Sequence, residues 1–181
     1  MSGPVPNDLR LIAAADDRWG LGRQGGLLAR ISPDLRRFKE LTLGHTVILG
    51  RKTLSTFPQG RPLAGRENII LSRDQSFQTP GARIAHSLEE LWTMLAGLKA
   101  GEPVFVCGGA QIYAQLVPYC RLAHITRVRG DFQADCHLLP LDREAAWQLT
   151  QRGELQSWQG WYYSFDEYQR IGSQGSSNQL I

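Results

Sequence analysis

Short apolar runs bounded by charge or glycine recur along the chain and predict the strands of a sheet. The clearest run, Leu9–Asp16, is almost continuously apolar, which indicates a central strand buried on both faces. The other runs of this kind are Thr46–Leu49, Asn68–Leu71, Ala82–Ala85, Pro103–Cys107 and Leu122–Val128, with Ala145–Gln151 and Trp161–Arg170 as a final antiparallel pair. The pattern therefore predicts about eight strands.

Stretches with helical spacing separate these strands. Leu35, Phe38 and Leu41 mark the buried face of the first predicted helix, which should begin at Ser32, a good N-cap, followed by Pro33. The other predicted helices are Gly50–Thr56, Ser87–Leu98 with Ser87 as its N-cap, and Ala110–Val117. Alternating strands and helices, without a repeat or linker, predict one α/β domain over residues 1–170. The polar, glycine- and serine-rich residues 171–181 are expected to be a disordered tail.

Composition places the chain among ordinary globular proteins, with 181 residues, 42% of them hydrophobic and 20% charged. No apolar run has membrane-spanning length and the N-terminus lacks the apolar core of a signal peptide, so a cytoplasmic location is expected. The three cysteines lack metal-ligand spacing and are expected to be reduced thiols. The four scattered histidines predict no metal site.

The net charge of +3 is spread along the chain, with arginines alternating with acids. Proteins that bind nucleic acid usually cluster their positive charge, so this distribution argues against that partner and favours a small anionic ligand. The glycine-rich segment Trp19–Gly26 is expected to be a loop. It follows the first strand, where the carboxyl end of a strand opens to ligands. Gly130–Pro140 is also expected to be a loop.

Asp34 is the acid in the first turn of the predicted helix that begins at Ser32. A first-turn acid commonly complements the helix dipole, and this is one interpretation of Asp34. Because Asp34 lies four residues before Phe38, its carboxylate should also point along the edge of the apolar face. The second interpretation is therefore a pocket carboxylate, and the helix alone leaves both open.

Two glycine turns have the shape of phosphate sites, because each follows a predicted strand and opens a predicted helix. They are Gly50-Arg51-Lys52-Thr53 and Gly108-Gly109-Ala110-Gln111. Helix N-termini present unpaired backbone N–H groups, and glycine lets an anion approach them closely. Neither turn has the P-loop ending or the GxGxxG spacing, and each is weak evidence by itself. Two such turns in one small domain favour a dinucleotide.

Arg73 follows a third strand, directly after Ser72. If the three strand ends share one edge of the sheet, Arg51 and Arg73 can bind one further phosphate, the 2′-phosphate that distinguishes NADP from NAD. The alternative, that both arginines are solvated loop charges, remains open at this point.

Together these residues resemble the dihydrofolate reductase family, in its bacterial form, from Leu11 to about Tyr168. The segments that carry the resemblance are LIAAADDRWGLG, SPDLRRFK, VILGRKT, GRPLAGRENIILSR, VFVCGGAQIY and HITRVRGDFQAD. The resemblance implies a three-layer α/β domain with a mixed, mostly parallel eight-stranded central sheet. It also implies an NADPH-dependent enzyme, a monomer, that reduces 7,8-dihydrofolate to 5,6,7,8-tetrahydrofolate by hydride transfer to C6 and protonation of N5.

The resemblance assigns roles to individual residues. The implied catalytic residues are Asp34, which holds the pterin 2-amino group and N3, with Leu27, Tyr113 and Thr126. The implied substrate site is Ile12, Ala13, Ala14, Asp34, Leu35, Phe38, Phe57, Leu63, Arg66, Cys107 and Thr126, with Arg66 pairing the α-carboxylate. The implied NADPH site is Ala14, Leu21, Gly22, Gly50, Arg51, Lys52, Thr53, Leu71, Ser72, Arg73, Cys107, Gly108, Gly109, Ala110, Gln111, Ile112 and Tyr113. Gly108–Gly109 stands where the family has a cis peptide.

The chain departs from the family at Leu28-Ala29, where many of these reductases have Pro-Trp. That tryptophan helps to fix the active-site loop and a water near the substrate, so the small Ala29 should leave a wider and wetter pocket mouth beside Asp34. Two extra residues around Pro58–Gly60 lengthen the loop beside Phe57.

Two other functions fit part of the pattern. A pyrimidine reductase of riboflavin synthesis shares the fold and NADPH, but Asp34 and Arg66 argue against it because its substrate carries a ribityl phosphate. A non-catalytic nucleotide-binding module would keep the phosphate sites without needing a buried Asp34.

Overall fold

Strand β1 (Asp8–Ala15) lies in the middle of the sheet, as its apolar run predicted. In the computed structural model, which describes residues 8–171, β1 pairs in parallel with β7 (Pro103–Gly108) on one side and β8 (Leu122–Val128) on the other. The remaining strands of the main sheet are β4 (Thr46–Gly50), β5 (Glu67–Leu71), β6 (Ala82–Ala85), β10 (Trp147–Gln151), β11 (Gln156–Trp158) and β12 (Trp161–Arg170).

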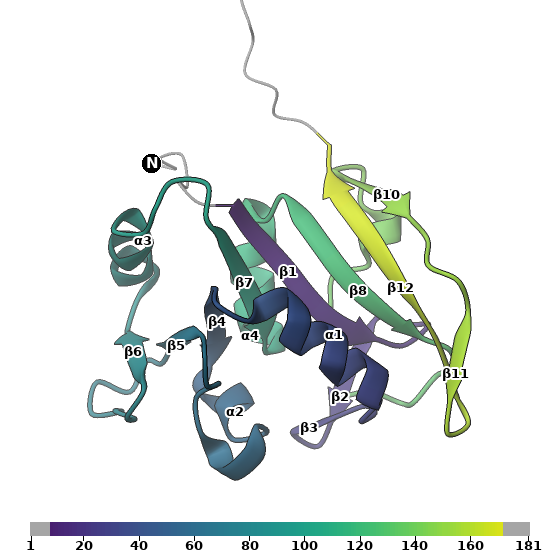
Figure 1. The fold of residues 1–181 in the computed structure, drawn as a ribbon, viewed down its shortest axis with the longest axis horizontal. Helices are drawn as coiled ribbons and strands as arrows, with labels where there is room; N and C mark the ends of the chain where they lie inside the picture. The colour runs from purple at the N-terminus through teal and green to yellow at the C-terminus, as the bar shows by residue number, and fades with distance from the viewer. Residues whose placement is uncertain (1–7, 172–181) are drawn as a thin grey trace, which may run out of the picture.

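The strand order β10-β12-β8-β1-β7-β4-β5-β6 confirms the mixed, mostly parallel sheet (Figure 1). The six strands from β8 to β6 run parallel, whereas β12 is antiparallel to β8 and β10 is antiparallel to β12. Strand β11 pairs with β12 beside this path. The carboxyl ends of the parallel strands therefore meet at one edge of the sheet.

Helices cover both faces of the sheet, and successive residues of β1 show the two cores that result. Ile12 packs in an apolar cluster with residues of β4, β5 and β7, against which Phe38 of α1 also packs. Leu11 and Ala13 point to the other cluster, which contains residues of α3 and α4. The helices are α1 (Ser32–Thr42), α2 (Arg51–Leu54), α3 (Leu88–Ala96) and α4 (Ala110–Leu116). Short 3₁₀ helices are η1 (Pro58–Gly60), η2 (Val117–Tyr119) and η3 (Leu141–Arg143). In Figure 1, α1 passes in front of the sheet and α4 lies behind it.

The start of α1 differs from the expected one. Ser32 is the first helical residue instead of the cap, and the extended residue before it, Ile31, makes no side-chain cap. Ile31 is only 2% exposed and packs with Val128 and Tyr163, so burial of its side chain fixes where the helix begins. Leu35 is 45% exposed, which means that the sheet covers less of the apolar face of α1 than expected.

A second, small sheet was not predicted. Its strands β2 (Gly20–Arg23), β3 (Gly26–Leu27) and β9 (Cys136–His137) come from the two segments expected to be loops. The buried carboxylate of Asp16 holds these segments together, because it accepts hydrogen bonds from the backbone N–H groups of Gly20 at 2.7 Å and of Phe132 at 3.2 Å. Gly20 is required there, since a Cβ would lie 2.4 Å from that of Ala134.

The structure also bears on the cysteines, on membrane-spanning helices and on metal ligands. Cys107, Cys120 and Cys136 form no disulfide bond with one another. Between residues 8 and 171, no helix is long and apolar enough to cross a membrane, and no group of three or more His, Cys, Asp or Glu side chains is placed to hold a metal ion. The predicted tail lies outside the described residues except for Ile171.

Helix α3 provides a test of the predicted cap. The Ser87 hydroxyl accepts a hydrogen bond from the Glu90 backbone N–H at 3.2 Å. Ser87→Ala should therefore lower the free energy of unfolding by about 1 kcal/mol, measured by urea denaturation. Ser87→Asp, which keeps an acceptor, serves as the control and should stay close to the original stability. Equal losses in the two variants would contradict the cap.

Candidate active site

A cavity of about 650 Å³ opens where β4, β5 and β7 end. Strand register brings these ends together, because Gly50 pairs with Leu71, and Leu49 with Gly108. All seventeen residues that the sequence assigned to NADPH lie around this cavity: Ala14, Leu21, Gly22, Gly50, Arg51, Lys52, Thr53, Leu71, Ser72, Arg73, Cys107, Gly108, Gly109, Ala110, Gln111, Ile112 and Tyr113. The two glycine turns and the third strand end thus share one site.

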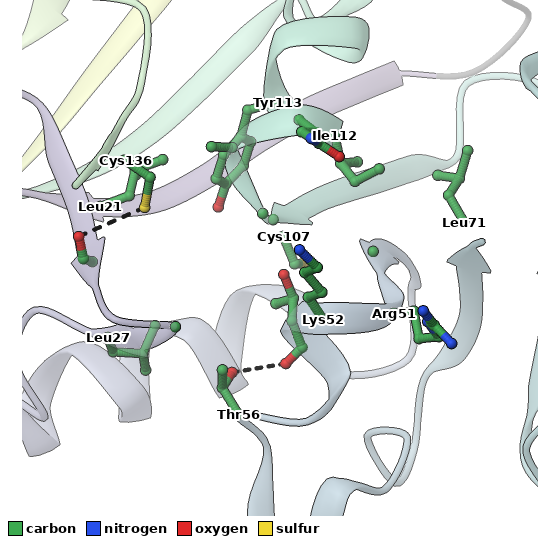
Figure 2. A pocket seen from close by; sticks show the side chains of 18 of the residues that line it. Leu21, Leu27, Arg51, Lys52, Thr56, Leu71, Cys107, Ile112, Tyr113 and Cys136 are labelled. Carbon is green, nitrogen blue, oxygen red and sulfur yellow. Dashed lines mark hydrogen bonds between the residues drawn. The ribbon is translucent and has the colours of Figure 1, made fainter. Parts of the chain in front are cut away.

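The cavity is long, and its two ends differ in charge. In Figure 2, Arg51 and Leu71 lie at one end, while Leu21, Leu27 and Cys136 lie at the opposite end. Arg73, which is exposed, follows Leu71 of the first end by two residues, whereas Lys52 lies between the two ends in Figure 2. The second end is formed by the hairpin β2–β3 and by β9. A ligand that spans the cavity would have its anionic part at the first end.

Glycines keep the floor of the cavity free of side chains. Gly108 and Gly109 are joined by a cis peptide bond, and Gly108 has a positive φ of 128°. A Cβ on Gly109 would lie 3.0 Å from the hydroxyl of Thr53, and one on Gly50 would lie 3.0 Å from the side chain of Ile112. The backbone is therefore close to any ligand that lies between α2 and α4.

An apolar cluster of side chains on the α1 face of the sheet adjoins this cavity. Five residues of the predicted substrate site belong to this cluster: Ile12, Phe38, Phe57, Leu63 and Cys107. Cys107 also lines the large cavity, so the cluster and the cavity meet at this residue. Burial raises the pKa of the Cys107 thiol, which stays neutral.

Two residues of the predicted substrate site are placed differently. The side chain of Ala13 packs in the core on the far face of the sheet, so only its backbone faces the α1 side. The reason is the alternation of side chains along β1, which turns Ile12 and Ala13 to opposite faces. Leu35 is exposed and lies outside that cluster.

Asp34 is tied to the sheet by a short hydrogen bond. The Thr126 hydroxyl of β8 donates to the Asp34 carboxylate at 2.6 Å, across 92 residues of sequence. Burial raises the pKa of Asp34 above its ordinary value, while the Thr126 hydrogen bond and the nearby Arg37 partly offset this rise. Thr126 pairs with Ala14 in the sheet, and Ala14 lines the large cavity. The Asp34 carboxylate is therefore held near that cavity, and a role at the helix dipole alone does not account for its hydrogen bond to Thr126.

Tyr113 and Arg66 are also held firmly. The Tyr113 hydroxyl donates to the Ile12 carbonyl at 2.8 Å, and burial raises the pKa of Tyr113 well above its usual value. The Arg66 guanidinium donates to the carbonyls of Ala64 and Lys39, at 2.6 and 3.3 Å, and to the Thr42 hydroxyl at 3.1 Å. These bonds fix the position of the Arg66 cation near the end of α1.

Residues that sequence reasoning missed also line the large cavity: Gly25, Gly26, Thr56, Asp74 and Cys136. Asp74 directly follows Arg73, so its position beside a strand end was readable from the sequence. Cys136 comes from a segment without local signal, and only its pairing with Gly22 across the small sheet brings it to the cavity.

The lengthened loop around Pro58–Gly60 lines a second cavity, whereas Ala29 does not. A second cavity of about 480 Å³ lies between the hairpin β2–β3 and the segment Ser55–Gln59. Ala29 does not line this cavity or the larger one, and it packs against the cluster of Ile31, Val128 and Tyr163. The wider and wetter pocket mouth expected beside Asp34 stays a prediction.

The sequence profile of the dihydrofolate reductase family matches residues 8–170. The chain belongs to this family. A dihydrofolate reductase of Staphylococcus haemolyticus is 34% identical over 165 residues, which are 90% of this chain and 96% of that protein. One from Bacillus subtilis is 31% identical over 91% of this chain and 96% of its own length. One from Mycobacterium leprae is 42% identical over 65% of this chain and 70% of its own.

A solved dihydrofolate reductase shares the fold. The enzyme from Enterococcus faecalis, in complex with NADP(H) and RAB-propyl, superposes with a TM-score of 0.77 and 27% identity, covering 91% of this chain and 96% of that one. The resemblance and the fold class expected from the sequence are confirmed.

The hydrogen bond between Thr126 and Asp34 gives a direct test of this dihydrofolate reductase site. A hydrogen bond to the charged form favours that form, so Thr126→Val should raise the pKa of Asp34 further. The carboxyl ¹³C titration measures this pKa, with Asp34→Asn used to assign the signal. Thr93→Val, on the opposite face of the sheet in α3, should leave it unchanged. An unchanged or lower pKa in Thr126→Val would contradict the assigned bond.

Proposed function

We propose that the chain reduces 7,8-dihydrofolate to 5,6,7,8-tetrahydrofolate with NADPH, the reaction of the family to which it belongs. The observation that carries the proposal at the level of residues is the partly buried Asp34–Thr126 pair next to a long cavity with a cationic end. The pterin of the substrate and the nicotinamide of the cofactor must lie in contact for hydride transfer. A carboxylate at Asp34 for the pterin, next to a cavity for the dinucleotide, suits this requirement.

The residues around the large cavity fit NADPH. Arg51 and Arg73 supply positive charge for a 2′-phosphate. The side-chain-free floor at Gly108 and Gly109 lets a diphosphate approach the backbone. The opposite end, with Ala14, Leu21 and Tyr113, takes the nicotinamide. When bound there, NADPH supplies the hydride.

Asp34 binds and polarises the pterin. Its carboxylate accepts hydrogen bonds from the 2-amino group and N3, and this negative charge raises the basicity of N5 through the conjugated ring. Thr126 fixes the carboxylate in position from behind. The apolar walls formed by Ile12, Phe38 and Phe57 exclude bulk water from the ring and hold it flat. Water at the mouth delivers the proton to N5.

Arg66 binds the glutamate tail of the substrate. Its guanidinium is fixed by three protein oxygens, so it is already oriented for a carboxylate. This arrangement disfavours the pyrimidine reductase alternative, whose substrate has a ribityl phosphate instead. A non-catalytic module would not need the buried Asp34. We also infer a cytoplasmic monomer that binds folate analogues and not nucleic acid, in keeping with the three unpaired thiols and the dispersed charge.

The direct test mixes the purified protein with NADPH and dihydrofolate and follows the absorbance of the reduced nicotinamide, which is lost when NADPH gives up its hydride. Oxidation of NADPH that depends on dihydrofolate supports the proposal. No oxidation above the rate without protein would overturn it.

Asp34→Asn should lower turnover by roughly two orders of magnitude or more, because it removes the charge that activates N5. Steady-state rates with NADPH and dihydrofolate measure the loss, and NADPH binding should be nearly unchanged. Glu40→Gln, an exposed acid on the same helix, is the matched control and should retain normal turnover. Near-normal turnover in Asp34→Asn would return Asp34 to a role at the helix dipole.

Arg51→Ala combined with Arg73→Ala should weaken NADPH much more than NADH, because only NADPH has the additional phosphate. A hydrogen bond to a charged group contributes about 1.5–3 kcal/mol, so the loss in NADPH affinity should be roughly tenfold or more. Titration of protein fluorescence with each cofactor measures the two dissociation constants. Equal weakening of both cofactors would make the arginines a general attraction for anions.

A further inference from the structure

The guanidinium of Arg51 is already paired with an acid of the same cavity. Its Nη1 lies 3.0 Å from Oδ2 of Asp74, and both residues line the cavity at its cationic end. The ring of Phe77 lies under the Arg51 guanidinium, with 5.6 Å from Cζ to the ring centroid. Asp74 thus stands where a bound phosphate would also interact with Arg51.

The carboxylate of Asp74 is fixed by its own segment. Its Oδ1 accepts hydrogen bonds from the backbone N–H and the hydroxyl of Ser76, at 3.0 and 2.7 Å. These bonds and the nearby Arg51 lower the pKa of Asp74, so the group is an anion at neutral pH. The backbone N–H of Asp74 donates to the Ser72 hydroxyl oxygen at 3.3 Å, which leaves the Ser72 O–H free to donate to a ligand. The Asp74 carboxylate is therefore held in a fixed position at this end of the cavity.

The charges at this end oppose one another. Arg51 and Arg73 attract a phosphate, while Asp74 repels it and competes with it for Arg51. This opposition acts on a 2′-phosphate and has little effect on a neutral 2′-hydroxyl, because only the phosphate carries charge. Asp74 should therefore affect one of the two nicotinamide cofactors selectively.

We propose that Asp74 is a specificity-determining residue for the cofactor, because its carboxylate competes with the 2′-phosphate of NADPH for Arg51. Asp74 therefore lowers the affinity for NADPH relative to the affinity for NADH. This proposal rests on the proposed NADPH site. It adds a negatively charged side chain to a phosphate site whose other charged side chains are positive.

The test is Asp74→Asn, which removes the charge and keeps an oxygen that can accept the two bonds from Ser76. Binding is measured by calorimetry at low salt with adenosine 2′,5′-bisphosphate and with adenosine 5′-monophosphate, and then with NADPH and NADH. The variant should bind the bisphosphate and NADPH roughly threefold more tightly or better, and the other two ligands with unchanged affinity. The gain should shrink as sodium chloride is added, because salt screens exposed charges.

Glu67→Gln is the matched control. Glu67 forms a comparable exposed ion pair with Arg83, 2.8 Å long, and neither residue lines the cavity. This variant should bind all four ligands as the unsubstituted protein does. Asp74→Glu, which keeps the charge, should not reproduce the gain.

Three outcomes would overturn the proposal. They are a weaker bisphosphate affinity in Asp74→Asn, an equal change for all ligands, and the absence of any preference for the bisphosphate in both proteins. None of these readouts needs turnover. A protein that behaves as expected toward the nucleotides but does not oxidise NADPH with dihydrofolate would overturn the proposed function alone.

Discussion

The register of β1 between β7 and β8 is the constraint on which the rest of the structure depends. It places Ala14 opposite Thr126 on one side and Leu11 opposite Val106 on the other. Through Thr126 it locates the carboxylate of Asp34, which comes from a helix on the face of the sheet. Through β7 it places Cys107 where the apolar cluster of Ile12 meets the large cavity. A slip of β1 by one residue would turn its own side chains, including those of Leu11 and Ala14, to the opposite face of the sheet.

Burial and solvation divide the site into two electrostatic regimes. Asp34 is partly withdrawn from water, and this loss of hydration raises its pKa and makes its one hydroxyl partner important. Arg51 and Asp74 are exposed at the other end, where water and salt screen each charge. The buried end can therefore be tuned by single hydrogen bonds. The exposed end depends on the balance of several charges, which is why the charge of Asp74 matters beside Arg51 and Arg73.

Much of the fold was predictable because its signals are local. The bounds of Leu122–Val128 and Ala82–Ala85 agree with those in the structure, since each is a short run between turn residues. The cap at Ser87 was also predictable, because a serine followed three residues later by Glu90 satisfies the first turn by itself. Local rules failed at Ser32, where the burial of Ile31 decides the start of the helix. They also failed for the small sheet, whose pairing of Gly22 with Cys136 joins segments 114 residues apart.

For the site, the sequence by itself determined the chemistry that each segment brings: a carboxylate at the start of a helix, and glycine turns and arginines after strands. These are properties of a residue and its near neighbours. The tertiary structure alone decided that Thr126 donates to Asp34, that Ala13 and Ile12 pack into clusters on opposite faces of the sheet, and that Asp74 pairs with Arg51 inside the cavity. Pairing, burial and the resulting pKa of Asp34 depend on which atoms displace water around a group. Those atoms are supplied by strands distant in sequence, and no local pattern records them.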